Sequence, residues 1–179
     1  MVSIHSKEII SVLKSLSKFK NKACSENISS EGLHETGAQT SKLIKQTTKY
    51  PDINEQEVIY SGPHFYVANP LSKCPRKNPK GKADFDNIDL INIDTNYLPR
   101  TKYVPFSKEI NLSQHLDWFS DGTSTTNYYK VVFSKMLNVT MERTLQPAII
   151  PPNFFHINGA ICNTLKDEYQ TIELAVITS

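Results

Sequence analysis

The sequence predicts an α+β domain, and three observations point to this class. The chain has 179 residues, of which 39% are hydrophobic and 21% charged, as is ordinary for one globular domain with a core. Helical and strand-like hydrophobic patterns both occur along the chain. They do not alternate regularly, as the repeating strand and helix units of a parallel α/β fold would.

The chain opens with a segment that we expect to form an amphipathic helix. Apolar side chains recur there at helical spacing, and lysines occupy the remaining faces. The apolar positions are Ile9, Val12, Leu13, Leu16 and Phe19, and the lysines are Lys7, Lys14, Lys18 and Lys20. The segment lacks the continuous apolar core and cleavage site of a signal peptide, and no stretch of the chain approaches the roughly 18 apolar residues of a membrane span.

Residues 21–56 are rich in Ser, Thr, Asn, Lys and Glu, with only scattered apolar side chains. This composition predicts a long irregular connection with room for one short helix. We therefore divide the chain into residues 1–56, the opening helix with this connection, and residues 57–179, the α+β core. The two parts together form a single domain.

Four later segments have the composition of β-strands. EVIYSGPHFYVANP, residues 57–70, predicts two short strand pieces joined by a bend at Ser-Gly-Pro. DNIDLINID, residues 86–94, predicts another strand. LQPAIIPPN and HINGAICNTL, residues 145–153 and 156–165, predict two more, and the prolines of the first suit an edge strand or a strand end.

Two further segments are not strand-like, and we expect a helix in the first and the start of a buried element in the second. NYYKVVFSKML, residues 127–137, predicts a helix because five large apolar residues fall on one side and the preceding DGTSTTN offers N-cap side chains. The last residues, TIELAVITS, are typical of the first turns of a buried element. They lack a polar end or a C-cap, so we expect the chain to be a piece of a longer polypeptide.

Basic residues are concentrated in KCPRKNPKGK, residues 73–82. The formal net charge of the chain is only +2, so binding to nucleic acid would depend on such a local patch. No acidic residue interrupts the segment, and its prolines and glycine keep it extended, so its cations can reach phosphates. The candidate DNA-binding residues are Lys73, Arg76, Lys77, Lys80 and Lys82. A merely solvated basic loop is the alternative.

A second basic pair, Arg100 and Lys102, lies in YLPRTKYVP between Tyr97 and Tyr103. Aromatic rings interleaved with cations can stack on bases or sugars while the cations hold phosphate. These tyrosines can equally be core residues that flank a turn. Arg100 and Lys102 complete the set of candidate DNA contacts.

Other chemistry is less well supported by the residues. Cys24, Cys74 and Cys162 are odd in number without CxxC spacing, which favours a reducing cytoplasm over a disulfide framework or a zinc knuckle. Four aspartates could hold Mg²⁺ for a nuclease, but strand alternation would direct them to different faces. The histidines have no partners at metal spacing. The aspartates are Asp84, Asp86, Asp89 and Asp94, and the histidines without such partners are His34, His64, His115 and His156.

Several blocks occur in a fixed order along the chain, namely SGPHFYVANPLSKCPR, DNIDLINID, YLPRTKYVP, YYKVVFSKML and ERTLQPAIIPPNFFHIN. Together they resemble the specificity region of large adenine-N6 DNA methyltransferases from bacterial restriction-modification and related phage-defence systems. The similarity covers most of the chain from Glu57 onward and is weaker through HETGAQ and TTKYPD. The chain departs from the family pattern at KCPR, where relatives have KTPR, and at Lys102, where relatives have asparagine.

The resemblance implies a target-recognition domain with a small, twisted, mixed sheet and flanking helices. Such a domain reads a short sequence in double-stranded DNA while a separate catalytic domain or subunit extrudes the adenine. ANPLS, residues 68–72, lacks the second proline and the aromatic of a methyltransferase Asn-Pro-Pro-aromatic loop, and no Gly-rich cofactor loop precedes it. We therefore expect no catalysis and no cofactor in this chain, with S-adenosylmethionine bound only by the catalytic domain.

The resemblance also gives the stretch ERTLQPAIIPPNFFHIN a structural role. Leu145 to Ile150 would form a strand, Pro151 and Pro152 would end it, and a phenylalanine would anchor the corner before the next strand. Two alternative functions stay open. The chain could be a module that joins domains or subunits of the same enzyme, or, with less support, a metal-dependent nuclease.

Overall fold

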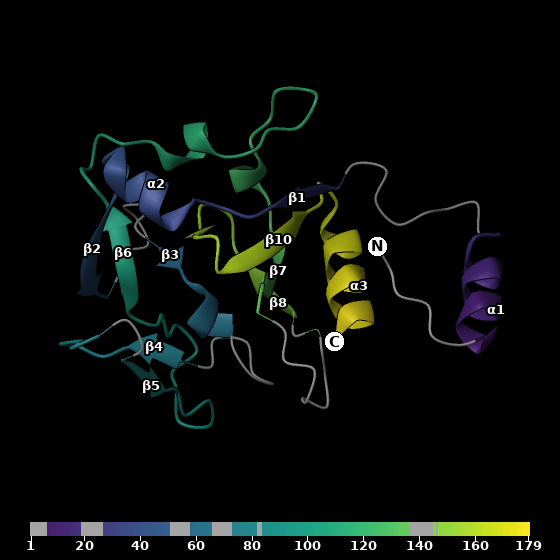
Figure 1. Ribbon diagram of the computed structural model, residues 1–179, viewed down its shortest axis with the longest axis horizontal. Helices are drawn as coiled ribbons and strands as arrows, with labels where there is room; N and C mark the ends of the chain where they lie inside the picture. The colour runs from purple at the N-terminus through teal and green to yellow at the C-terminus, as the bar shows by residue number, and fades with distance from the viewer. Residues whose placement is uncertain are drawn as a thin grey trace.

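The computed structural model describes residues 7–18, 27–50, 58–65, 73–81, 84–136, 145 and 147–179. Within these residues the chain forms helices, two four-stranded sheets and a two-stranded hairpin (Figure 1). The sheets are antiparallel or mixed, and strands and helices do not alternate regularly. The predicted α+β class is therefore confirmed. No helix in the described residues is long and apolar enough to cross a membrane.

The first sheet has the strand order β1-β10-β7-β8, and each neighbouring pair is antiparallel. Its strands are β1 (Ile28–Ser30), β10 (Ala160–Thr164), β7 (Lys130–Ser134) and β8 (Pro147–Ile150). Helix α3 (Glu168–Thr178) follows β10 and packs on β7 and β8. The Asp167 side chain caps α3 by accepting hydrogen bonds from the backbone N–H groups of Tyr169 and Gln170.

The second sheet has the order β2-β6-β3-β9. Its strands are β2 (Ile44–Lys49), β6 (Thr101–Pro105), β3 (Ile59–Tyr60) and β9 (Phe155–His156). The pairs β2·β6 and β3·β6 are antiparallel and the pair β3·β9 is parallel, so this sheet is mixed. Helix α2 (Glu35–Thr40) lies against β2. Strand β2 forms one edge of the sheet.

The remaining elements lie around these sheets. Strands β4 (Lys73–Pro75) and β5 (Phe85–Asn87) pair as an antiparallel hairpin. In the described connections lie the 3-10 helices η2 (Gly62–Phe65), η3 (Leu112–His115) and η4 (Thr125–Asn127). Helix α1 (Lys7–Leu16) has no buried residue and stands apart from the sheets in Figure 1.

Two hydrophobic clusters form the core, and the second sheet separates them. Phe154 belongs to the first cluster, whereas Phe155 belongs to the second. Tyr60 and Ile59 divide in the same way, because successive residues of a strand point to opposite faces. The two adjacent phenylalanines of PPNFFHIN therefore fill two different cores.

Two glycines allow the segment after β3 to touch the turn between β9 and β10. A Cβ atom placed on Gly62 would lie 2.6 Å from the carbonyl oxygen of Gly159. A Cβ atom on Gly159 would lie 2.9 Å from the backbone nitrogen of Gly62. Only residues without a side chain permit this approach of two backbones.

The predicted helix over residues 127–137 is wrong, because Lys130–Ser134 forms strand β7. Val131, Val132 and Phe133 are all buried, so the strand is covered on both faces and shows no alternation of apolar and polar residues. The run of apolar residues that results also matches helical spacing. Pairing with β10 and β8 on its two sides decides in favour of the strand. The end of the predicted helix, at Leu137, lies outside the described residues.

Two other predictions need correction. The strand expected over residues 86–94 ends at Asn87, and the chain then turns, with the Asp89 carboxylate accepting a hydrogen bond from the backbone N–H of Ile91. The irregular connection expected over residues 21–56 is wrong for residues 27–50, because β1 and β2 both lie there and pair with strands from the later part of the chain. The short helix expected there is α2.

The remaining expectations are confirmed in part. Strand β8 ends directly before Pro151 at an edge of the first sheet, as its prolines predict. The single strand expected over residues 156–165 is divided, because β9 ends at His156 in the second sheet and β10 begins at Ala160 in the first sheet, with a turn between them. The first strand piece of residues 57–70 is β3, but a 3-10 helix follows it and residues 66–70 lie outside the description. The terminal segment is helical but not buried, since Thr171 is the one buried residue of α3.

Candidate nucleic-acid interface

Arg100 anchors the β4–β5 hairpin to the second sheet. It precedes β6, and its guanidinium contacts three separate segments. Nε donates a hydrogen bond to the carbonyl oxygen of Pro75 at 2.8 Å, and Nη1 donates to the hydroxyl of Tyr50 at 2.9 Å. Nη2 lies 3.4 Å from the carboxylate of Asp86. The side chain of Arg100 is only 16% exposed, so its main role is to position the hairpin.

The aspartates of the hairpin shape the loop between its strands. Asp86 forms an ion pair with Nε of Arg76 at 3.0 Å. The Asp84 carboxylate accepts hydrogen bonds from the backbone N–H groups of Lys80 and Gly81, at 2.6 and 3.1 Å. Because these contacts use backbone donors of the loop, the side chains of Lys77 and Lys80 remain at the surface.

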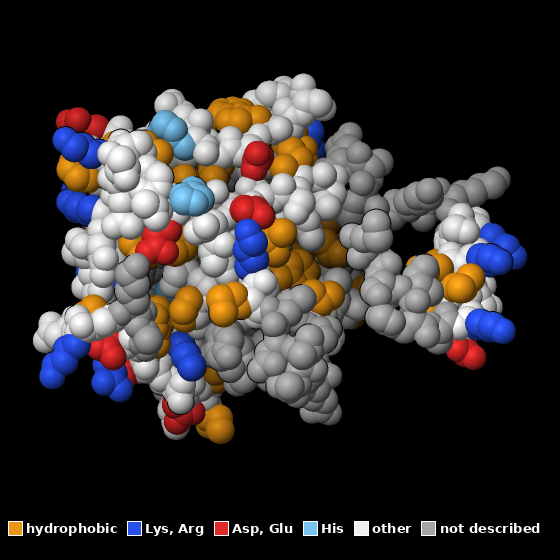
Figure 2. All heavy atoms as spheres, viewed as in Figure 1, with side chains coloured by type: hydrophobic (Ala, Val, Ile, Leu, Met, Phe, Trp, Pro, Cys, Tyr) orange, Lys and Arg blue, Asp and Glu red, His pale blue; other side chains and the backbone are white. Residues whose placement is uncertain are grey.

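An open hollow of about 670 Å³ lies between this loop and strand β2. Its lining residues are Gln46, Thr48, Lys77, Asn78, Pro79 and Lys80. None of them carries a carboxylate, and two carry amide side chains that can both donate and accept hydrogen bonds. Figure 2 shows lysine and arginine side chains along the edge of the molecule where β2 and the hairpin lie in Figure 1.

Exposed aromatic rings lie near both ends of β2. Tyr50, which follows the strand, is 60% exposed, and the Arg100 guanidinium carbon lies 5.2 Å from its ring centroid. Phe106 is also exposed, and Nζ of Lys45 lies 5.8 Å from its ring centroid. This edge therefore combines cations, amides and aromatic faces, the groups that bind phosphates, base edges and base planes.

The predicted DNA-binding residues separate into distinct groups. Lys77, Lys80 and Arg76 are exposed together on the hairpin loop, and Lys73 is partly buried on β4. Lys82 lies outside the described residues. Arg100 is mostly engaged within the protein.

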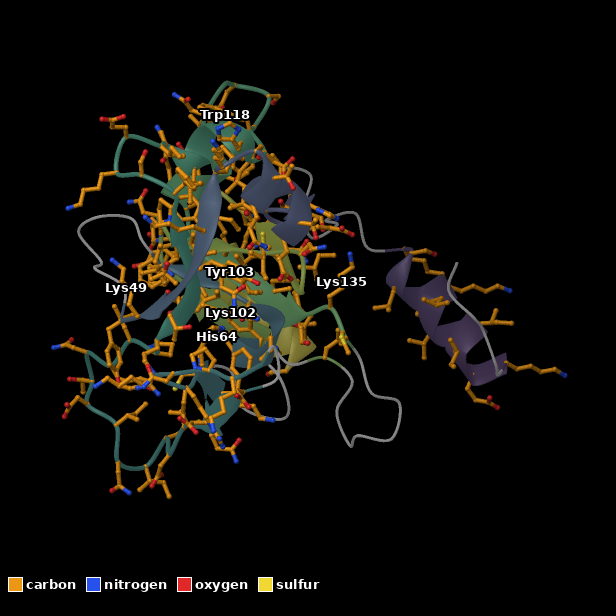
Figure 3. The ribbon with its side chains drawn as sticks, turned by 60° about the vertical axis from the view of Figure 1, so that its left-hand side comes forward. Lys49, His64, Lys102, Tyr103, Trp118 and Lys135 are labelled. Atoms are coloured by element: carbon orange, nitrogen blue, oxygen red, sulfur yellow. The ribbon has the colours of Figure 1, made fainter. Side chains whose placement is uncertain are left out.

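Lys102, on β6, is only 7% exposed, so little of its side chain is available to phosphate. In Figure 3 it lies among the strands, whereas Lys49, at the end of β2, lies toward the outer edge.

The sequence did not predict that strand β2 lines one side of this hollow. Lys45, Gln46, Thr48 and Tyr50 lie in IKQTTKY, within the segment interpreted as an irregular connection. A signal was present, since a basic and threonine-rich run that ends in tyrosine is typical of an exposed edge strand. It was hidden because one apolar residue alone, Ile44, marks the buried side of the strand.

Most of the predicted aspartates and histidines have structural partners, namely Asp84, Asp86, Asp89, His34, His64 and His156. In the described residues no group of three His, Cys, Asp or Glu side chains is placed to hold a metal ion. His64 is fully buried, with Nε2 3.0 Å from the carbonyl oxygen of Arg100 and Nδ1 3.0 Å from the backbone nitrogen of Ser61. Burial lowers the pKa of His64, so the ring is neutral and supports the Arg100 backbone.

No protein-family model matches the chain, and neither a curated protein nor a solved structure matches it.

Proposed function

We propose that this chain is a DNA-binding module that reads a short duplex sequence and has no catalytic activity of its own. The observation that carries the proposal is the hollow between β2 and the hairpin loop, with cations and amides but no carboxylate among its lining side chains. Because the net charge of the chain is small, such a local site is what DNA binding requires.

The lining residues suggest separate roles in binding. Lys77 and Lys80 would hold phosphates, since lysine acts as a point charge that tolerates many geometries. Gln46 and Asn78 would face base edges, because a side-chain amide can donate and accept at the same time, as adenine requires. Tyr50 would offer a ring for stacking, with Arg100 fixing its position.

The family resemblance supports a more specific version of the proposal. The module would be the target-recognition part of a restriction-modification adenine methyltransferase and would act in the cytoplasm together with a catalytic domain or subunit. S-adenosylmethionine would bind to that catalytic part. Arg76 and Arg100, which were predicted to contact DNA, would instead support the hairpin through their contacts with Asp86 and Pro75. Lys102 is not retained as a phosphate contact, because it is buried.

The test is a fluorescence-anisotropy titration of the full chain with a mixed pool of duplex DNA at low salt. We expect the wild type to bind, and the double variant Lys77→Gln with Lys80→Gln to bind at least about tenfold more weakly to all sequences alike. Lys135→Gln is the matched control, because Lys135 lies on the opposite side of the molecule from Lys49 in Figure 3 and pairs with Glu31. Equal binding by all three proteins would remove the hollow from the DNA interface.

A second candidate function is an interaction module, which the exposed apolar side chains of α1 and α3 favour. This function does not exclude DNA binding, because these helices and the hollow use different residues. Self-association in the absence of DNA would support it.

A further inference from the structure

We propose that two copies of this chain pair through helices α1 and α3. Helix α1 of each copy would pack on the outer side of α3 of the other copy, so that the same contact forms twice around a two-fold axis. The proposal rests on the uncovered faces of the two helices and on their charges, and it is independent of DNA binding.

The first observation is that α1 has an apolar stripe that none of the described residues buries. Its five large apolar residues are exposed, and no residue of the helix is buried. These residues are Ile9, Ile10, Val12, Leu13 and Leu16. A helix of 10 residues is marginal in water by itself, since most helical stability in proteins comes from packing of an apolar face. Helix α1 therefore needs a partner that its own chain does not supply in the described residues.

The second observation is a matching stripe on α3. The inner side of this helix packs on β7 and β8, with Thr171 buried. On the outer side, Tyr169, Ile172 and Val176 follow one another at spacings of three and four residues, and Ile177 lies beside them. All four side chains are more than half exposed, and Tyr169 is 81% exposed. A surface of this kind marks a contact site.

Charge determines which helices pair. Helix α1 carries Lys7 and Lys14 against Glu8, and α3 carries Glu168 and Glu173 without any basic residue. Two α3 helices side by side would bring only like charges together, and two α1 helices would leave the stripe of α3 uncovered. Pairing α1 with α3 brings opposite charges together while it covers both apolar stripes. The partner that fits α3 is therefore the α1 helix of a second copy.

The proposal is tested by sedimentation equilibrium of the full chain over a concentration series without DNA. We expect a concentration-dependent dimer. Leu13→Asp on α1 and Ile172→Asp on α3 should each raise the dimer dissociation constant at least about tenfold, because each places a charge in an apolar contact. Ile91→Asp is the control for the same chemical change, since Ile91 is 92% exposed in the loop after β5, and it should leave the constant unchanged.

Mixing the two defective variants tests whether α1 of one copy contacts α3 of the other. In a dimer of one Leu13→Asp chain and one Ile172→Asp chain, one of the two contacts is unchanged. It joins α1 of the Ile172→Asp chain to α3 of the Leu13→Asp chain. We therefore expect heterodimers in the mixture at concentrations where each variant alone is monomeric. A monomeric wild type, a dimer weakened by only one of the two changes, or a mixture without heterodimers would each overturn the proposal.

Discussion

Lys130 is the residue of the core whose chemistry is least expected. It begins β7 and is buried, with Nζ donating a hydrogen bond to the carbonyl oxygen of Phe154 at 3.0 Å. Burial lowers the pKa of Lys130 to about 8. Burial, together with a smaller effect of the nearby charge of Lys130, lowers the pKa of His156 to about 4. Both side chains therefore bind a proton more weakly in the folded protein than in the unfolded chain.

The pKa of Lys130 predicts that this residue contributes more to stability as the pH rises from 8 to 9.5. In the unfolded chain the lysine keeps its proton up to about pH 10.4, so in this interval the unfolded state binds more protons at this residue than the folded state. Lys130 should therefore add roughly 1–2 kcal/mol to the free energy of unfolding over this interval. Burial raises the pKa of the Cys162 thiol, which acts in the opposite direction in the same interval, so the effect of Lys130 is measured by urea denaturation as a difference from a variant without the amine. Burial raises the pKa values of Tyr60 and Tyr103, but this effect weakens the fold only near and above pH 10.

The variant Lys130→Met provides the control for this prediction. Methionine has a similar length and no titrating group, so the variant keeps the opposing effect of Cys162 and lacks that of Lys130. Between pH 8 and 9.5 the wild type should gain roughly 1–2 kcal/mol in free energy of unfolding relative to the variant. A difference between the two proteins that stays constant or shrinks over this interval would contradict the account of a buried, weakly basic amine.

At the scale of elements, the backbone contact between Gly62 and Gly159 holds the segment after β3 against the turn between β9 and β10. We expect Gly62→Ala to lower the free energy of unfolding by about 2 kcal/mol or more, because the added methyl group meets rigid backbone rather than a side chain that can move. Gly81→Ala is the matched control, since a Cβ atom there would meet nothing within 4 Å. Equal stability of both variants by urea denaturation would show that the two backbones do not touch.

The attachment of the hairpin to the second sheet makes a separate prediction. Arg100→Lys should speed hydrogen exchange in β4 and β5, because lysine cannot hold Pro75, Tyr50 and Asp86 at the same time. Arg76→Lys removes one exposed contact to the same aspartate and should change exchange little. Similar exchange in the two variants would mean that Arg100 does not anchor the hairpin.

The elements also show how far the sequence alone predicts the fold. Strands β8 and β10 were predictable because prolines and β-branched residues mark them locally. Strand β7 was not, because a strand buried on both faces has no period of two and its apolar spacing also fits a helix. Strands β1 and β2 are short and polar, and each is a strand because it pairs with a distant partner.

The candidate site could be predicted only in part, because some of its residues are neighbours in the sequence and others are brought together by the fold. The basic run on the hairpin loop is continuous in sequence, so Lys77 and Lys80 could be identified directly. Gln46 and Thr48 face them across the hollow from a strand that lies far away in the chain. Burial of Lys102 depends on the packing of β6 between β2 and β3, which the motif YLPRTKYVP does not reveal.

At the scale of the whole molecule, the two proposed associations would use two different surfaces. The hollow and the edge strand β2 lie on the side of Lys49, and helix α3 lies beside the first sheet (Figures 1 and 3). Since the proposed DNA binding and the proposed dimerisation use different side chains, a variant should lose one without the other. A two-fold dimer would also present two DNA sites, as expected for reading of paired half-sites.

The central claim is that cations at the hollow contact DNA phosphates, and the salt dependence of binding tests it most directly. The affinity of the wild type for one fixed duplex is measured at several salt concentrations, beside Lys77→Gln with Lys80→Gln and beside Lys135→Gln. Each phosphate contact adds about 0.9 to the slope of log affinity against log salt, so we predict a slope that is shallower by nearly 2 in the double variant and unchanged in the control. Equal slopes in all three proteins, or no binding by the wild type at low salt, would contradict the account.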